Sequence, residues 1–160
     1  HGYYTMTRDD ITRGEKFPDG ITRSRYFIAL HNPKGAHDVQ QAEGTQGALR
    51  RDFGPPEGDF YEVPFRSLVN QNCPNLIVAC RALSATHEAA AAVRVMATMH
   101  GVGQAAGIAA AKACAEACPV NRIPGEWVRS MIPYMEQAPD FEEPWLAKAG
   151  FPWSVEPSVI

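Results

Sequence analysis

The sequence predicts a mixed fold of the α/β class, or α+β if the chain is taken by itself, and two segments carry this prediction. Residues 75–79 read NLIVA, a short continuous apolar run that is typical of a strand buried on both faces. Residues 98–117 are rich in alanine and favour a helix. A chain of 160 residues with 45% hydrophobic residues is long enough to form one domain-sized core.

The first 30 residues should contain a helix and a strand. Thr7 is a suitable N-cap, and Asp9 and Asp10 favour the positive end of a helix start. This helix should end before Pro18, because the residue that precedes a proline disfavours the helical conformation. Residues 26–30, YFIAL, are aromatic and β-branched enough to predict a strand.

A long loop and a second strand should follow. Residues 31–59 contain many glycines and prolines among polar residues, which predicts a loop. A loop of that length inside a compact domain is usually functional or lies against another surface. Residues 60–65, FYEVPF, alternate as a strand does, and Pro64 restricts this strand to a sheet edge or ends it.

The C-terminal part should be helical and then irregular. Pro119 should end the alanine-rich helix, because proline cannot continue it. Residues 122–137 are another helix candidate, with Pro124 near its start. The tail from residue 139 onward combines prolines with two tryptophans, which predicts an irregular arm with aromatic anchors.

Composition and missing motifs exclude several classes of function. The net charge of −3 argues against a general nucleic-acid or membrane role. The sequence has no HExxH pair, no serine elbow and no Walker motif. Its four cysteines form no C-x-x-C pair, and we expect Cys114 and Cys118 to be buried thiols rather than metal ligands or a disulfide, with a thiol-dependent role as a weak alternative. Reduced cysteines favour a cytoplasmic protein.

The glycine-rich run GVGQAAG, residues 101–107, should lie at the start of the long helix. A helix start carries unpaired N–H groups and a partial positive charge, and glycines let an electron-rich ligand reach them. Packing of small residues against another helix explains the same glycines and is the commoner situation. The run does not follow a strand as GxGxxG, so it is no dinucleotide fingerprint.

Polar residues between the predicted strand and helix are candidates for chemistry. Arg81 follows the strand and suits either a phosphate or a surface ion pair. His87, in the segment SATHEA, could exchange a proton with a substrate hydroxyl, although a lone histidine is more often structural. Arg94 could stabilise negative charge on a bound ligand or form a salt bridge, and His31 could line a pocket from the long loop.

Five segments in order carry a resemblance to a known family: FPDGI, YFIALH, FYEVPFRSLV, NLIVACRALSATHEA and VRVMATMHGVGQAAGIAAA. They resemble the C-terminal part of the FAD-dependent oxidoreductases, two-domain flavoproteins of the glutathione-reductase-like class. The resemblance implies an FAD-binding, Rossmann-like fold whose N-terminal half carries GxGxxG, and this sequence contains no such fingerprint. The dinucleotide-binding half would come from a second polypeptide or from another part of a longer enzyme, and we slightly favour the partner.

The resemblance also implies which residues approach the cofactor. Those near the pyrophosphate or ribityl chain would be Ala79, Cys80, Arg81 and Ala82, and those near the flavin ring would be Met99, Gly101, Gly103, Gln104 and Ala105. Cys80 stands where the family usually has the glycine of VAGR, and its Cβ would crowd a closely approaching cofactor.

The implied activity is hydride transfer between an organic substrate and the flavin. His87 is the first candidate for acid–base catalysis, followed by Arg94 and His31. The alternative is a non-catalytic interaction subunit of a flavoprotein complex, which Cys80 favours. The sequence predicts neither the substrate nor the electron acceptor.

The same reading divides the chain into three parts. Residues 1–74 would belong to the substrate or cap region, and residues 75–118 would supply the C-terminal strand and helix of the FAD-binding domain. Residues 119–160 would form a C-terminal helix and the irregular arm.

Overall fold

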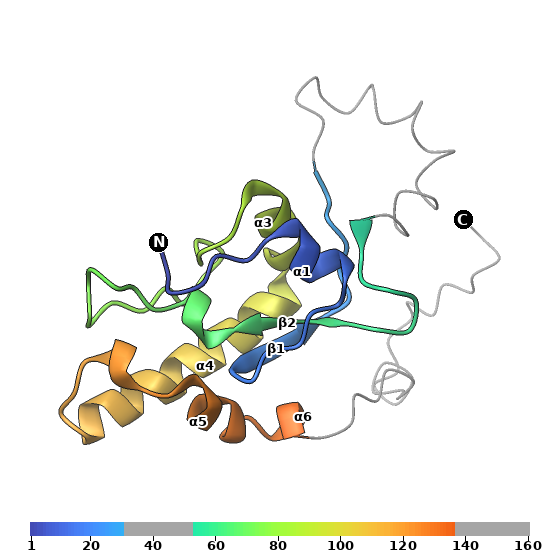
Figure 1. The fold of residues 1–160 in the computed structure, drawn as a ribbon. Helices are drawn as coiled ribbons and strands as arrows, with labels where there is room; N and C mark the ends of the chain where they lie inside the picture. The colour runs from blue at the N-terminus through green and yellow to red at the C-terminus, as the bar shows by residue number, and fades with distance from the viewer. Residues whose placement is uncertain (31–52, 137–160) are drawn as a thin grey trace.

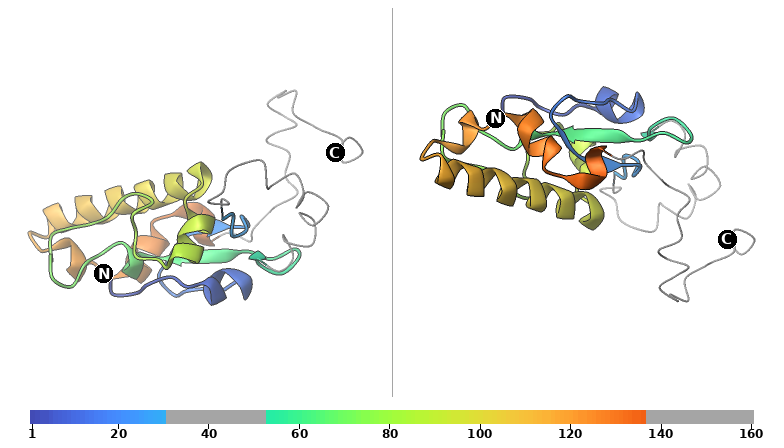
Figure 2. Two further views of the ribbon diagram at one scale, coloured as in Figure 1. Left: turned by 90° about the horizontal axis from the view of Figure 1, so that it is seen from above. Right: turned by 90° about the horizontal axis from the view of Figure 1, so that it is seen from below.

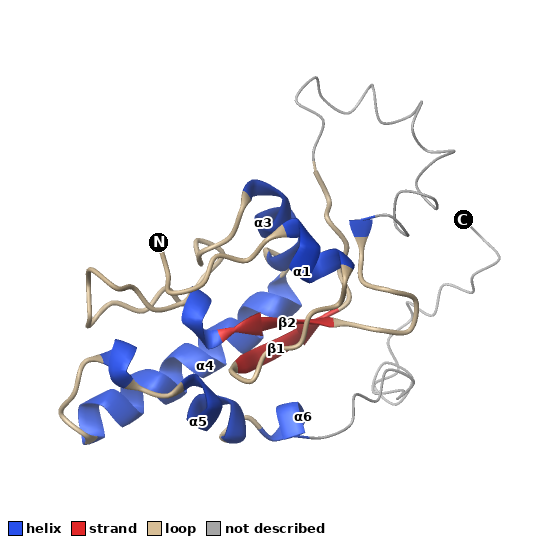
Figure 3. Cartoon of the chain, viewed as in Figure 1, coloured by secondary structure: helices blue, strands red, loops and turns tan. Residues whose placement is uncertain are grey.

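The computed structural model describes residues 1–30 and 53–136 (Figure 1). Two short strands form an antiparallel sheet, β1 Gly20–Ser24 and β2 Tyr61–Pro64. The helices are α1 Arg8–Thr12, α3 His87–Val93, α4 Met96–Ala115, α5 Gly125–Ser130 and α6 Pro133–Glu136, with single 3-10 turns at Phe65–Ser67 and Val120–Arg122. Figure 3 shows this mixed α/β composition around a two-stranded sheet.

The register of the sheet runs from Gly20 opposite Pro64 to Ser24 opposite Tyr61, with an irregularity after Gly20. The strand predicted at residues 60–65 is therefore confirmed, and Pro64 stands at its end as expected. The strand predicted at residues 26–30 is wrong. Pairing stops at Ser24, and the chain beyond it is held by a hydrogen bond from the Ile28 amide to the Phe53 carbonyl, 2.8 Å long, outside any strand.

The first helix begins after Thr7 as predicted. Asp10 reaches back so that its carboxylate accepts a hydrogen bond of 2.6 Å from the Thr7 amide, which satisfies a donor that the helix itself leaves unpaired. The Tyr4 hydroxyl donates to the same carboxylate at 2.8 Å. Asp10 thereby fixes the N-terminal segment against the helix start.

The long helix α4 covers one face of the strands and α1 lies on the other, as Figure 2 shows. Gly101 makes the approach of α4 to β1 possible. A Cβ at this position would lie 2.4 Å from the Thr22 hydroxyl oxygen, so any other residue would force the two elements apart. The predicted helix at residues 98–117 is confirmed with slightly earlier bounds.

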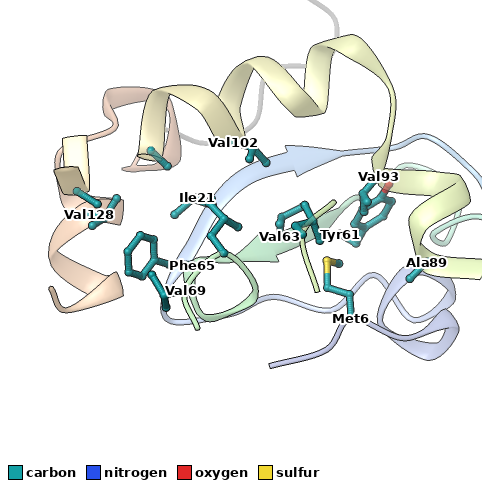
Figure 4. Close-up of a cluster of buried hydrophobic side chains, with 14 of the residues drawn as sticks. Met6, Ile21, Tyr61, Val63, Phe65, Val69, Ala89, Val93, Val102 and Val128 are labelled. Atoms are coloured by element: carbon teal, nitrogen blue, oxygen red, sulfur yellow. The ribbon is translucent and has the colours of Figure 1, made fainter. Parts of the chain in front are cut away.

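The core lies between these layers and contains side chains from most of the described elements (Figure 4). Met6 and Ala89 are on one side, Val63 and Phe65 come from β2 and the turn after it, and Val128 comes from α5. The described residues of the predicted parts 1–74, 75–118 and 119–160 thus share one core, and the assignment of these parts to regions of a flavoprotein stays a prediction.

Residues 75–79 do not form the buried strand that the sequence predicts. Ile77 makes a single antiparallel bridge with Val69, while Leu76 is 46% exposed. A strand buried on both faces needs neighbours on both sides, and among the described residues this run has one bridge. The apolar run is therefore only partly covered: Ile77 packs against the core and is half-buried, as Val78 is, while the rest is exposed.

The C-terminal helical region is shorter than predicted. Pro133 interrupts the expected helix at 122–137, which appears as α5 and α6. The predicted arm from residue 139 lies outside the described residues. Within the described ranges, no helix is both long and apolar enough to span a bilayer.

Candidate functional site

The clearest hollow that contains predicted catalytic residues lies at helix α3. It has a volume of about 320 Å³, and its walls are formed by residues 29–30 together with side chains from and around α3. His87 is the first residue of α3, and Arg94 caps its other end. Because seven residues make about two helical turns, both side chains point to the same face. The lining residues are Ala29, Leu30, Arg81, His87, Ala90, Ala91 and Arg94.

The sequence explains why α3 presents this face. The Thr86 hydroxyl accepts a hydrogen bond of 3.4 Å from the Ala89 amide and so caps the helix. The preceding backbone is fixed to the N-terminal segment, since the Thr86 amide donates to the Met6 carbonyl at 2.8 Å. Ala89 and Val93 are completely buried, so the face that carries His87 and Arg94 turns away from the core.

The hollow has basic side chains and an apolar wall. Arg94 is half-buried, and its Nη2 donates a hydrogen bond of 3.2 Å to the Ala29 carbonyl. Arg81 and His87 are exposed and form no hydrogen bond or ion pair within the described part of the chain. The nearest acidic residue in sequence, Glu88, does not line the hollow and faces Arg8 at 3.8 Å instead.

The structure thus brings together three of the predicted residues, His87, Arg94 and Arg81. His31, the third predicted catalytic residue, lies outside the described residues. Leu30 and the alanines of α3 were not predicted as lining residues. The signal that could have identified them is the spacing of His87, Ala90, Ala91 and Arg94, which is the periodicity of one helix face.

The glycines predicted at a helix start lie further inside the helix. Because α4 begins at Met96, Gly101 belongs to its second turn, and Gly103 and Gly107 come later still. The unpaired N–H groups belong instead to the first turn, after Val95. Val95 has no side-chain acceptor and makes no capping hydrogen bond, and Met96 is 89% exposed. The Met99 amide already donates to the Val95 carbonyl at 3.0 Å, so the open helix start is at residues 96–98.

The predicted cofactor residues of α4 divide between two faces. Gly101 and Ala105 are on the inner face, where Ala105 is completely buried, and Met99 packs at the edge of the core. Gly103 and Gly107 are on the outer face, where an added Cβ would meet no atom within 4 Å. Gln104 is exposed beside them.

The predicted pyrophosphate segment, residues 79–82, follows no regular strand. It is an exposed turn in which the Leu83 amide donates to the Cys80 carbonyl at 3.1 Å. Ala79 and Cys80 are exposed, so the Cys80 side chain does not occupy a buried position in the described part of the chain. Ala82 lines a separate shallow hollow beside residues 67–70.

The cysteines are free, but the expectation that Cys114 and Cys118 are buried is wrong. Cys114 is exposed and Cys118 is half-buried, and both line an apolar groove of about 470 Å³ between residues 75–77 and the end of α4. Asn75 and Ile77 line the same groove. Within residues 1–30 and 53–136, no group of three His, Cys, Asp or Glu side chains could hold a metal ion.

Comparison with known proteins agrees with the resemblance. The family model described as FAD dependent oxidoreductase matches residues 1–132, which include all the described elements up to α5 and the entire hollow at α3. No curated protein and no solved structure matches the chain. The match covers most of the sequence, and the chain belongs to the FAD-dependent oxidoreductase family.

Proposed function

We infer that this chain is the C-terminal portion or small subunit of an FAD-dependent oxidoreductase and that it completes the flavin site. The observation that supports this most strongly is the position of the hollow with His87 and Arg94 directly before the open start of α4. Only Val95 separates Arg94 from Met96 along the chain, so acid–base groups and the helix start lie in one region. The activity is hydride transfer between an organic substrate and the flavin.

The outer face of α4 fits a flavin. The first-turn N–H groups have no side-chain cap, and a helix start carries about half a positive charge, which favours an electron-rich ring edge. Gly103 and Gly107 leave open space above the helix backbone, so a flat ring could approach it closely. When bound, FAD supplies a two-electron acceptor for the hydride.

The residues of the hollow would position the substrate and handle its proton. A ring nitrogen of His87 would accept the proton of a substrate hydroxyl, because the imidazole is exposed and has no partner within the described chain. Arg94, held at one nitrogen by the Ala29 carbonyl, keeps other N–H groups for orienting the substrate. The small side chains of Ala90 and Ala91 leave room for it.

We further propose that a polypeptide with the GxGxxG half covers the exposed apolar surface, either as a separate subunit or as another part of the same protein. The exposed apolar side chains include Leu76, near the end of α4, and Met96, at its start. Two paired strands are few for a stable sheet, and apolar surface of this kind marks an interaction site. The four free thiols favour a reducing compartment such as the cytoplasm.

Native mass spectrometry of the protein isolated from its source cells tests this function first. A complex that contains this chain, FAD and a GxGxxG sequence supports the proposal. Flavin reduction by substrate, followed by stopped flow, should then be slower in His87→Ala with flavin content unchanged. His1→Ala is the matched control, since His1 is exposed and does not line the hollow.

The same experiments also test the alternative that Cys80 favours, which is a non-catalytic subunit. A colourless complex without FAD would support that alternative, and restored flavin binding in Cys80→Gly would identify the added Cβ as its cause. Loss of flavin in His87→Ala would instead make His87 a structural residue.

A further inference from the structure

The polar side chains that line the hollow at α3 are all basic. Two arginines, Arg81 and Arg94, and one histidine, His87, line it, and no carboxylate lines it within the described part of the chain. The remaining wall consists of Ala29, Leu30 and two alanines of α3. A hollow with fixed positive charge and an apolar wall fits a ligand with an anionic head and a carbon body.

The two arginines are not neutralised by the protein. Arg94 uses one nitrogen on a neutral acceptor, the Ala29 carbonyl, which leaves its charge uncompensated. Arg81 has no hydrogen bond or ion pair with the described residues. Elsewhere in the described fold Glu62 pairs with Arg129 and Asp19 with Arg66. Arg81 and Arg94 instead line the same hollow without a carboxylate partner among the described residues.

We propose that this hollow binds the carboxylate of a small organic acid, with the guanidinium groups of Arg94 and Arg81 as donors. A planar guanidinium presents parallel N–H groups that match a carboxylate. The carbon body lies against Leu30 and the α3 alanines. This names the substrate class of the proposed site and rests on the proposed function. A cofactor diphosphate offers the same oxyanion chemistry, and the experiment below separates the two sources.

Chemical-shift titration of the full chain with benzoate tests the proposal, with benzamide as the neutral probe of the same shape. Benzoate should shift the amide resonances of Ala29, Leu30, Ala90 and Ala91 in a saturable manner, and benzamide should not. Loss of a charged hydrogen bond weakens binding about tenfold, so we expect this loss for Arg81→Gln and for Arg94→Gln. Arg122→Gln, which removes the same charge from an exposed position outside the hollow, should bind like the wild type.

Arg81 is the safer of the two substitutions, because Arg94 also holds the Ala29 carbonyl. If Arg94→Gln loses its dispersed spectrum, the Arg81→Gln result alone decides. Binding of benzoate that is equal in Arg81→Gln and the wild type would overturn the proposal, as would equal binding of benzamide.

A parallel titration with ADP identifies the source of the oxyanion. If ADP shifts the same resonances and displaces benzoate at a lower concentration, the hollow takes the cofactor diphosphate, and the carboxylate proposal fails. The proposed function can fail separately. A complex without FAD whose hollow still binds benzoate would refute the flavoenzyme and keep the carboxylate site, whereas a flavin-loaded complex with no benzoate shift would refute only the carboxylate site.

Discussion

The Glu62 carboxylate and the Arg129 guanidinium form a two-pronged ion pair, with Nη1 and Nη2 at 2.9 and 3.2 Å from the two oxygens. The Glu62 side chain is only 3% exposed. Its Oε2 also accepts a hydrogen bond of 3.1 Å from the Phe17 amide, and Arg129 donates to the Gly20 carbonyl at 3.1 Å. This pair therefore connects α5 to both strands of the sheet.

Removing one partner of this pair should destabilise the fold strongly. In Glu62→Gln the half-buried Arg129 loses its buried counterion and keeps only the exposed Glu136 carboxylate at 3.7 Å, and breaking a buried pair in this way costs about 3 kcal/mol. Urea denaturation followed by circular dichroism measures the free energy of unfolding. Asp9→Asn is the control, because the Asp9–Arg13 pair is exposed on both sides and contributes at most about 0.5 kcal/mol. Equal losses in both variants would contradict this role for Glu62.

Local signals in the sequence predict α1 and α4 well. Thr7 with Asp10 determines the start of α1, and the alanine content and Pro119 bound α4. The strands are harder to predict, because an apolar run indicates only that a segment is suited to burial. Residues 75–79 have that character and are exposed or half-buried in the described chain, whereas β1 is half polar and mostly buried. Whether a segment is buried depends on which other segments pack against it, and an apolar run does not identify them.

The candidate site was predicted in part for the same reason. His87 and Arg94 stand out as chemical residues, and the helix that places them on one face was read as a polar connection. The contribution of Ala29 and Leu30 could not be predicted, since it arises from a long-range contact between residue 29 and Arg94. The two faces of α4 follow from tertiary packing on Thr22, which glycine spacing does not reveal.

The glycines of α4 should respond oppositely to alanine. At Gly101 a Cβ would collide with Thr22 and with the Tyr134 hydroxyl, so Gly101→Ala should lose roughly 2 kcal/mol of stability. At Gly107 nothing lies within 4 Å, so Gly107→Ala should gain up to about 1 kcal/mol from helix propensity. Thermal unfolding of the two variants measures this contrast.

Gly103→Ala tests whether a flavin contacts the outer face of α4. It should stabilise the isolated chain as Gly107→Ala does, since its surroundings are equally open. If a flavin ring approaches the helix there, the same substitution should reduce the FAD content of the complex. A stabilised variant with full FAD content would show that the flavin does not contact the backbone at Gly103.

Stability should fall at alkaline pH because of two tyrosines. Partial burial and the Asp10 carboxylate raise the pKa of Tyr4 to about 12, and burial raises the pKa of Tyr61 to about 12. Because both folded-state pKa values lie above the unfolded value of about 10, the protonated forms favour folding. Their contribution is complete below about pH 10 and is lost as the pH rises toward about 12.

Urea denaturation at increasing alkaline pH, together with the ultraviolet absorbance of tyrosinate, measures this loss. Tyr4→Phe should flatten the dependence of the unfolding free energy on pH, since phenylalanine does not ionise. An unchanged slope in Tyr4→Phe and in Tyr61→Phe would show that other groups control alkaline unfolding.

The reactivity of the cysteines tests whether a partner covers the apolar groove between residues 75–77 and the end of α4. Cys73, Cys80 and Cys114 are exposed, so a thiol reagent should modify all three rapidly in the isolated folded chain, and Cys118 more slowly. If a GxGxxG polypeptide covers residues 75–77 and the end of α4, assembly should protect Cys114, which lines that groove. Mass spectrometry of alkylated peptides from the free chain and from the complex compares the two states. Equal labelling of Cys114 in both would leave the groove uncovered, and unchanged activity after alkylation would exclude a thiol-dependent role.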